Sequence, residues 1–206
     1  MKISLIGMSN AGKTTISKRL IKHGFTIFSC DDFIEKKLEN ELKKNGYKGI
    51  SDVALWMGHP YEEKYKQTSE TYIQLEEKSM HEILDIIEKV SEDKNIVIDT
   101  TGSVIYLSKN IKKRLFDNTK VIYIETPQSA YKEMFETFLN EPKPLIWGNM
   151  FDKHESESVH DAFYRCYPAL LKWRAKAYKK IAHDIISVSK LRHSGGLDHL
   201  LSIINS

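Results

Sequence analysis

The stretch GMSNAGKT, residues 7–14, decides the fold of this chain. The spacing Gly7-x-x-x-x-Gly12-Lys13-Thr14 is the P-loop, or Walker A, pattern. It lies where its mechanism requires, directly after a short apolar run and at the start of a helical pattern. Main-chain N–H groups of such a loop, together with the amino end of the helix, form a binding site for phosphate groups. The sequence therefore predicts that this loop binds a nucleoside triphosphate.

The residues of this loop have separate expected tasks. Lys13 is predicted to reach the β- and γ-phosphates of ATP, and the Thr14 hydroxyl is predicted to ligate Mg²⁺. The Asn-Lys-x-Asp pattern with which GTPases select guanine is absent from the sequence, which argues against a GTPase. The predicted nucleotide-binding residues are Gly7, Asn10, Ala11, Gly12, Lys13, Thr14 and Thr15.

Length and periodicity predict one domain that spans residues 1–206, because one hydrophobic core suffices at this size. Apolar, β-branched runs predict strands at 2–7, 25–29, 95–99, 120–125 and 184–189. Helical patterns cover 13–23, 32–44, about 60–90, 108–116, 128–139, about 161–183 and about 196–204. Alternation of strand and helix indicates an α/β fold, a parallel sheet with helices on both faces.

Composition narrows the class of protein. The chain is 41% hydrophobic and 29% charged, which is typical of water-soluble globular proteins. No apolar run is long enough for a membrane span or a secretory signal, and two cysteines are too few for a disulfide framework, so we expect a cytoplasmic protein without a membrane partner. The net charge of +3 is spread along the chain, which argues against a nucleic-acid partner. The oligomeric state stays open.

Carboxylates follow two of the predicted strands, at the edge of a parallel sheet where ligands bind. Asp31 and Asp32 come after the second strand, and one of them is expected to orient or deprotonate an attacking hydroxyl; the alternative is that they only cap the next helix. Asp99 ends the third strand and is a candidate to hold Mg²⁺ through water. Residues 100–103 either grip a polar substrate or form a plain hydrogen-bonded turn.

The least regular segment, residues 140–161, is predicted to be a mobile lid, since a break of this length inside an α/β domain is more often functional than a plain connection. Within it, Lys143 or Lys153 is expected to neutralise charge on the transferred phosphoryl group. Trp147 and Phe151 either cover a base or substrate or anchor the loop on the core.

A family resemblance rests on several of these features in their order along the chain. They are the P-loop, the Asp-x-x-Ile-Glu setting of Asp31 to Glu35, the segment Lys143-Pro144-Leu145-Ile146, and Arg174-x-x-x-Tyr178-x-x-x-Ala182 before the last strand. In this order the chain resembles the shikimate kinases, members of the nucleoside monophosphate kinase-like P-loop fold.

The resemblance implies a three-layer P-loop fold with a five-stranded parallel sheet in the order 2-3-1-4-5. It implies a substrate-binding helical region at about residues 31–90 and a lid that closes over ATP. By the same resemblance Asp31 is the carboxylate that receives the acceptor hydroxyl's hydrogen bond, and Arg174 binds a substrate carboxylate. Lys143 stands where the family has a lid arginine, and Gly102 lies in the substrate-binding glycine segment.

The chain also departs from the family pattern. Ser29 replaces a second aspartate two residues before the catalytic one, a loss that Asp32 or Asp99 is a candidate to offset. The triple glycine after the third strand is here Thr101-Gly102-Ser103. The family's Phe-Arg-x-x-Glu has no clear counterpart in residues 59–72, so a substrate-binding arginine is missing. Lysines there do not replace it, because they lack the bidentate fork.

The leading hypothesis is an ATP- and Mg²⁺-dependent kinase that phosphorylates a hydroxyl of a small polar metabolite, in the manner of shikimate kinase. Its proposed catalytic residues are Lys13, Asp31 and Lys143; Asp31, Gly102 and Arg174 bind the acceptor, and Thr14 and Asp99 hold the metal. One alternative keeps the fold but makes the acceptor a nucleoside, nucleotide or polynucleotide end. A second alternative is a non-catalytic nucleotide-binding module.

Overall fold

A parallel sheet forms the centre of the computed structural model, which describes residues 1–47, 52–141, 143–193 and 195–204. Its strand order is β2-β3-β1-β4-β5, and every neighbouring pair runs parallel. The strands are β1 (Lys2–Ile6), β2 (Thr26–Ser29), β3 (Ile96–Asp99), β4 (Lys120–Glu125) and β5 (Asp184–Ser187). This confirms the order 2-3-1-4-5 and the P-loop fold class predicted from the sequence.

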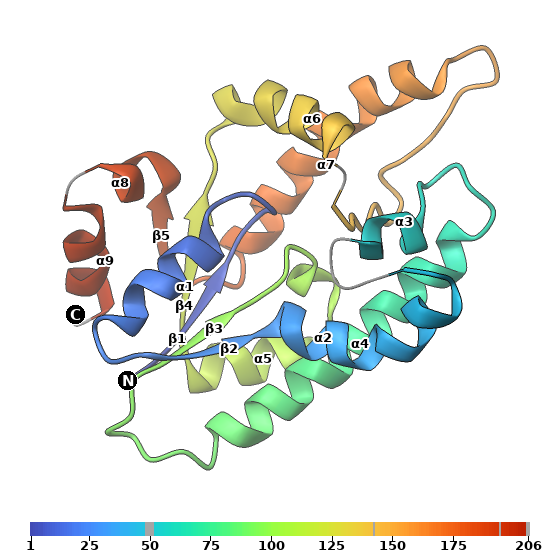
Figure 1. Ribbon diagram of the computed structural model, residues 1–206. Coiled ribbons are helices and arrows are strands. Elements are labelled where there is room, and N and C mark those ends of the chain that lie inside the picture. The colour runs from blue at the N-terminus through green and yellow to red at the C-terminus, as the bar shows by residue number, and fades with distance from the viewer. Residues whose placement is uncertain (48–51, 142, 194, 205–206) are drawn as a thin grey trace.

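Helices connect the strands in the described part of the chain (Figure 1). The α-helices are α1 (Lys13–Ile21), α2 (Cys30–Lys44), α3 (Val53–Met57), α4 (Tyr65–Ile87), α5 (Lys109–Asn118), α6 (Tyr131–Asn140), α7 (Val159–Lys179), α8 (Val188–Arg192) and α9 (Gly196–Ile204). Two short 3₁₀ helices, η2 (Val104–Tyr106) and η3 (Gln128–Ala130), follow β3 and β4. None of the described helices is both long and apolar enough to traverse a bilayer.

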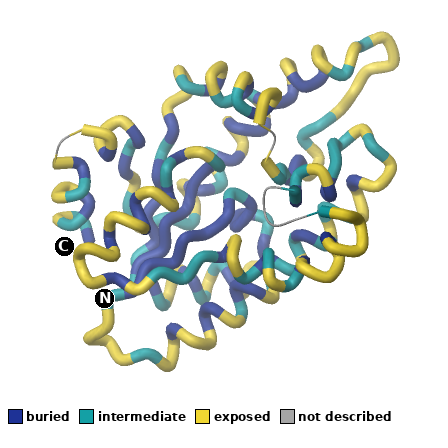
Figure 2. The backbone as a smooth tube through the Cα atoms, viewed as in Figure 1, coloured by how far each residue is buried: buried dark blue, intermediate teal, exposed yellow. Residues whose placement is uncertain are grey.

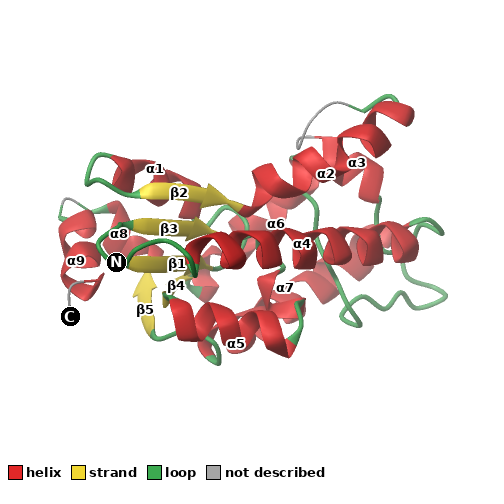
Figure 3. Ribbon diagram, turned by 90° about the horizontal axis from the view of Figure 1, so that it is seen from below, coloured by secondary structure: helices red, strands yellow, loops and turns green. Residues whose placement is uncertain are grey.

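The sheet separates two layers of helices. Figures 1 and 3 show α1, α8 and α9 on one side and α4 and α5 on the other. Two strand residues show the alternation that divides the core: Ile122 packs with α1, α8 and α9, whereas Tyr123 packs with the larger cluster that includes α2, α4 and α7. In Figure 2 the central strands are dark blue, because helices cover both of their faces.

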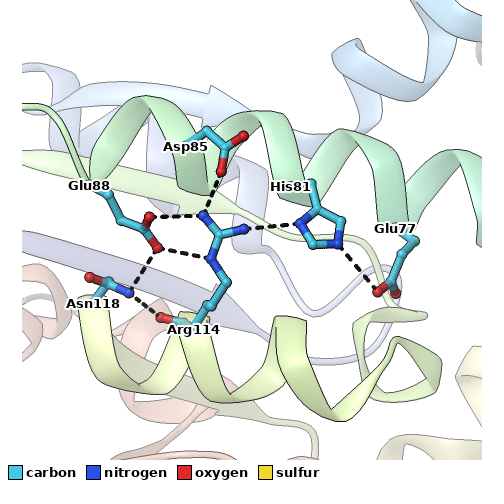
Figure 4. Close-up of polar contacts among 6 residues, drawn as sticks. All are labelled: Glu77, His81, Asp85, Glu88, Arg114 and Asn118. Atoms are coloured by element: carbon cyan, nitrogen blue, oxygen red, sulfur yellow. Dashed lines mark hydrogen bonds and ion pairs between the residues drawn. The ribbon is translucent and has the colours of Figure 1, made fainter.

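Polar contacts fix α4 against α5 at the surface of the larger layer (Figure 4). The Arg114 guanidinium of α5 donates to Asp85 at 2.6 Å and to both carboxylate oxygens of Glu88 at 2.9 Å. It also lies 2.9 Å from Nδ1 of His81, and the other ring nitrogen of His81 faces Glu77 at 3.8 Å. The planar guanidinium therefore fixes the register of α5 on the long helix α4, which carries part of the site described below.

The element boundaries differ from the sequence prediction mainly at helix ends. Helix α4 is shorter than the predicted helix at about 60–90, and the short helix α3 ahead of it was not predicted. The predicted strand 184–189 ends at Ser187, whose hydroxyl caps α8 by accepting from the Lys190 amide at 3.3 Å. The apolar period could not mark that change, because α8 is only five residues long.

The central sheet predicts a clear contrast between two isoleucine-to-alanine variants. Ile122 in β4 is fully buried, whereas Ile185 in β5 has 46% of its surface exposed. We expect Ile122→Ala to lower the free energy of unfolding by about 2–5 kcal/mol, through lost transfer energy and a cavity. Ile185→Ala, the matched control, should lose less than about 1 kcal/mol. Urea unfolding measures both; equal losses would contradict the layered core.

Candidate active site

The P-loop connects β1 to α1 through a backbone that few residues can adopt. Asn10 has φ 63° and Gly12 has φ 86°, both in the left-handed region. Gly7 has φ 148°, and a Cβ atom there would lie 2.8 Å from the main-chain oxygen of Ile124 in β4. Because β4 packs so closely against the start of the loop, Gly7 has both a conformational and a steric reason to be glycine.

The amino end of α1 is suited to bind an anion. Gly12 is its N-cap residue, and within the described chain no side chain caps the helix. The first-turn amides, Lys13 to Thr15, have no acceptor inside the helix, and the helix dipole is positive at this end. Thr14 and Thr15 are exposed. A phosphate group would satisfy these N–H groups.

Two lysines approach the loop from different elements. The Lys13 ammonium group is buried and donates to the main-chain oxygens of Gly7 at 3.0 Å and Met8 at 3.1 Å. Burial lowers the pKa of Lys13, although Asp99 and Asp31 act in the opposite direction. Lys143, from the segment that follows α6, donates to Oδ1 of Asn10 at 2.6 Å. The predicted lid therefore touches the P-loop through a charged side chain.

A cavity of about 750 Å³ opens from the P-loop toward the helices beyond the carboxyl ends of the strands. At one end it is lined by loop residues and Lys143, and at the other by Asp31, Tyr72 and Arg174. The full described lining is Ser9, Asn10, Gly12, Lys13, Thr14, Thr15, Asp31, Tyr72, Thr100, Thr101, Gly102, Ser103, Glu141, Lys143, Pro144, Ile146 and Arg174. One cavity thus contains most of the sequence-predicted nucleotide, acceptor and lid residues.

Two carboxylates lie beside Lys13. Asp31 lines the cavity, where loss of water around the carboxylate raises its pKa and Lys13 opposes the rise. Asp99 is buried at the end of β3; burial raises its pKa, against Lys13 and a hydrogen bond from Thr14. The capping alternative for the aspartates is wrong, because helix α2 already begins at Cys30 and Ser29 caps it, accepting from the Asp32 amide at 3.2 Å.

The segment after β3, residues 101–103, is held from below by the long helix α4. Glu76 of α4 is fully buried, and its two carboxyl oxygens lie in hydrogen bonds with the hydroxyls of Thr101 and Ser103, each at 2.5 Å. The two hydroxyls lie 2.9 Å from each other. Burial raises the pKa of Glu76 to about 7, more than these hydrogen bonds lower it. The segment is therefore a built feature of the cavity wall.

Helix α7 holds the same segment from another side. Arg174 is 2% exposed and donates from its two terminal nitrogens to the main-chain oxygens of Gly102 at 3.1 Å and Ile146 at 2.7 Å. Tyr178 donates to the same Gly102 oxygen. The Nε atom of Arg174 is buried without a partner among the described residues, and no described carboxylate forms an ion pair with this guanidinium. The buried positive charge is thus compensated by main-chain oxygens and the ring of Tyr106, 5.4 Å away, but by no ion pair among the described residues.

The base of the predicted lid is anchored by hydrogen bonds from two tyrosines. The Tyr65 hydroxyl donates to the Leu145 oxygen at 2.8 Å and accepts from the Trp147 amide at 2.9 Å, and Tyr106 donates to the Ile146 oxygen at 3.0 Å. Trp147 is 1% exposed. Its ring packs among Phe138, Phe151, Phe163 and Tyr167.

Of the two alternatives for Trp147 and Phe151, anchoring on the core is therefore the observed one. Arg165, the other arginine of α7, forms an ion pair with Glu157 at 2.7 Å and is not among the described cavity residues. Lys153, the alternative to Lys143, is exposed and also absent from the described lining. Lys143 is the lid lysine that reaches the loop.

Sequence reasoning missed Glu76 and did not include Tyr72 among the predicted site residues. Tyr72 is buried and lines the cavity, and burial raises its pKa well above the usual value, with Glu76 adding to the rise. A signal was present, because Tyr72-Ile73-x-x-Glu76 has the spacing of the family's Phe-Arg-x-x-Glu, a few residues beyond the stretch in which a counterpart was sought. Ile73 then occupies the arginine position, and it packs on the core.

Comparison with known proteins agrees with this arrangement. Shikimate kinase of Buchnera aphidicola subsp. Baizongia pistaciae is 29% identical over 145 residues, covering 70% of this chain and 67% of that protein. The solved shikimate kinase of Acinetobacter baumannii in complex with shikimate has a TM-score of 0.61 at 21% identity, covering 99% of this chain and 90% of that one.

Two further solved structures share the fold. The shikimate kinase of Bacteroides thetaiotaomicron has a TM-score of 0.63 at 16% identity, covering 100% of this chain and 99% of that chain. Dephospho-CoA kinase from Campylobacter jejuni has a TM-score of 0.55 at 14% identity, with 98% and 96% covered. No family model matches the chain.

The fold and the loop geometry define a P-loop kinase. Within that class, the chain is similar to the shikimate kinases, and this similarity supports an ATP-dependent kinase of small metabolites. Neither a nucleoside, nucleotide or polynucleotide acceptor nor a non-catalytic module is needed to account for these findings.

The role of Lys13 can be separated from that of its helix. We expect Lys13→Met to lower the rate of phosphoryl transfer below about 1% of the wild-type rate, because the variant lacks the cation predicted to face the phosphates. Lys18→Met is the matched control, since Lys18 is exposed on the same helix. A coupled ADP-release assay measures both; retained activity in Lys13→Met would contradict the assignment.

Proposed function

We propose that the protein transfers the γ-phosphate of ATP to a hydroxyl of a small acceptor that carries a carboxylate, with shikimate as the first candidate. The proposal rests chiefly on one observation: a single cavity joins the P-loop to Asp31 and to the buried guanidinium of Arg174, which has no ion-pair partner among the described residues. Shikimate carries both a hydroxyl and a carboxylate, and it is the molecule bound in the solved structure of the Acinetobacter baumannii enzyme.

The P-loop and the two lysines form the nucleotide half of the proposed site. Main-chain amides at the start of α1 receive the phosphates, and Lys13 exchanges its main-chain contacts with Gly7 and Met8 for phosphate oxygens. Lys143 lies against Asn10, close enough to the loop to add positive charge as the phosphoryl group moves. The amides and both lysines would donate hydrogen bonds directly to the oxygens on which negative charge develops during transfer.

Mg²⁺ fits the oxygen donors at this end of the cavity. The Thr14 hydroxyl lowers the pKa of the Asp99 carboxyl, and both groups are hard oxygen ligands of the kind that Mg²⁺ prefers. We propose that Thr14 holds the ion directly and Asp99 through water. When bound, the ion would neutralise charge on the β- and γ-phosphates. One carboxylate suffices, because Mg²⁺ at nucleotide sites takes its other ligands from phosphates and water.

Asp31 is proposed to accept the proton of the attacking hydroxyl. Its carboxylate lines the same cavity as the loop and the 101–103 segment. Loss of water raises the pKa of Asp31, and the positive charge of Lys13 limits this rise. A raised pKa makes this carboxylate a stronger base than an ordinary aspartate. The acceptor carboxylate then pairs with Arg174, whose guanidinium also donates to the main-chain oxygen of Gly102 in the cavity wall.

The base assignment is tested by two neighbouring aspartates. We expect Asp31→Asn to slow transfer by about 10²–10⁴-fold while ATP binding stays within about twofold, because the amide cannot take the proton. Asp32→Asn should leave the rate almost unchanged, since Asp32 lies outside the described cavity lining, whereas Asp31, which is also exposed, is part of it. Turnover numbers and isothermal titration with ATP measure the two quantities. Equal loss in both variants would refute the assignment to Asp31.

Arg174 allows a second test, on the acceptor side. We expect Arg174→Lys to raise KM for a carboxylate acceptor by roughly 10–100-fold, because lysine cannot reproduce the planar donors. KM for ATP should change little. Arg165→Lys, on the same helix but paired with Glu157 outside the described lining, is the control. The assay compares shikimate with its uncharged amide; if Arg174→Lys weakens both acceptors equally, the carboxylate contact is wrong.

A further inference from the structure

Glu76 is a buried titratable group with no part in the chemistry proposed above. Its carboxyl group is fully buried below the cavity wall, and within the described chain no cation pairs with it. The Thr101 hydroxyl lies 2.5 Å from one carboxyl oxygen of Glu76, and the Ser103 hydroxyl lies 2.5 Å from the other. The two hydroxyls lie 2.9 Å from each other. The arrangement is a closed ring of three side chains.

The number of protons in this ring depends on the state of Glu76. Each hydroxyl supplies one proton, so an ionised Glu76 leaves two protons for three contacts. Both protons would then point to the carboxylate, and the 2.9 Å contact would bring hydroxyl oxygens together with no proton between them. A protonated Glu76 supplies the third proton, and each contact becomes a hydrogen bond.

The surrounding atoms support the protonated form. The Ser103 amide donates to the Thr101 hydroxyl oxygen at 3.0 Å, so in the closed ring Thr101 gives one hydrogen bond and accepts two, its full capacity. Ser103 retains one free lone pair, whichever way the ring of protons runs, and its side chain belongs to the cavity lining. That lone pair is available to accept a hydrogen bond from a hydroxyl of the acceptor.

We propose that Glu76 is a positioning residue that acts in its protonated form. Protonated Glu76 closes the ring that orients residues 101–103 for the acceptor, and it leaves the positive charge of Arg174 to the acceptor's carboxylate. This rests on the proposed function, because it assumes an anionic acceptor. Ionisation of Glu76 would open the ring and would partly neutralise the field of Arg174, so both effects weaken acceptor binding.

Other ionisable groups face Glu76 from three helices, and they act in both directions. The groups that interact electrostatically with Glu76 are Asp31, Cys30, Tyr72, Arg174 and Tyr178. Asp31 opposes ionisation of Glu76, whereas Arg174 favours it. Burial raises the pKa of Glu76 to about 7, so the proton is lost as the pH rises through neutrality.

The experiment compares wild type with Glu76→Gln, Glu76→Ala and the exposed control Glu70→Gln on the same helix. The glutamine amide donates where the carboxyl proton donates, so it maintains the ring at every pH. For wild type and Glu70→Gln, KM for shikimate should rise above about pH 7, approaching tenfold per pH unit. Glu76→Gln should bind without this rise, and Glu76→Ala should raise KM roughly 10–100-fold at all pH values.

The dissociation constant for ATP and the circular dichroism spectrum should stay the same in all four proteins, which separates positioning from unfolding. A pH profile of KM in Glu76→Gln identical to that of wild type overturns the proposal. So does a Glu76→Gln variant as impaired as Glu76→Ala, because the ring then has no role in binding.

Infrared spectroscopy tests the proton without any acceptor. Wild type at pH 6 should show the stretching band of a protonated, buried carboxyl group, and Glu76→Gln should lack it. If wild type phosphorylates no acceptor that carries a carboxylate, the proposed function fails, and the infrared band alone tests the protonated ring. The presence of the band in wild type supports the ring, and its absence from wild type overturns it.

Discussion

The parallel pairing of β1 with β3 and β4 is the constraint on which the whole site depends. Leu5 of β1 lies opposite Asp99 in β3 and Ile122 in β4, so all three strands end at the same edge. The Leu5 oxygen accepts from both the amide and the hydroxyl of Thr100, at 3.3 Å and 2.8 Å. This double contact ties the start of the acceptor segment to the strand that leads into the P-loop. The residues proposed to bind nucleotide and acceptor are thus held at a fixed separation before either ligand binds.

The edge collects polar groups that would be costly anywhere else in the core. Lys13, Asp99, Glu76 and Arg174 are all buried, and a buried charge is tolerated only where hydrogen bonds and opposite charges compensate it. The four are compensated unequally. Lys13 lies near two carboxylates and two main-chain oxygens, whereas Arg174 has only main-chain oxygens for its terminal nitrogens. The incompletely compensated group is the one at the acceptor end, where a ligand anion would complete it.

The sequence was informative where chemistry requires a fixed spacing. The P-loop pattern and the five apolar runs were sufficient for the fold class, since each is local and each has one mechanical role, whereas the order of the strands was implied by the family resemblance. Glu76 was not found in the same way, because its partners Thr101 and Ser103 are 25 and 27 residues away and no local pattern links them. Trp147 shows the same limit: its sequence allowed both a ligand contact and a packing role, and only the surrounding rings decide between them.

The substitution of isoleucine at position 73 and the ring at Glu76 have a common physical logic. In the family pattern a glutamate three residues after an arginine has a cation beside it on the same helix. Here Ile73 packs on the core instead, so Glu76 has lost that neighbour, and an ionised carboxylate in this position would have no ion-pair partner among the described residues, only the more distant charge of Arg174. Two hydroxyls, in place of glycines of the family's triple-glycine segment, now occupy its hydrogen-bonding capacity. The departures from the family pattern are therefore coupled: removal of the arginine favours a neutral glutamate, and Thr101 and Ser103 supply the partners that a neutral glutamate needs.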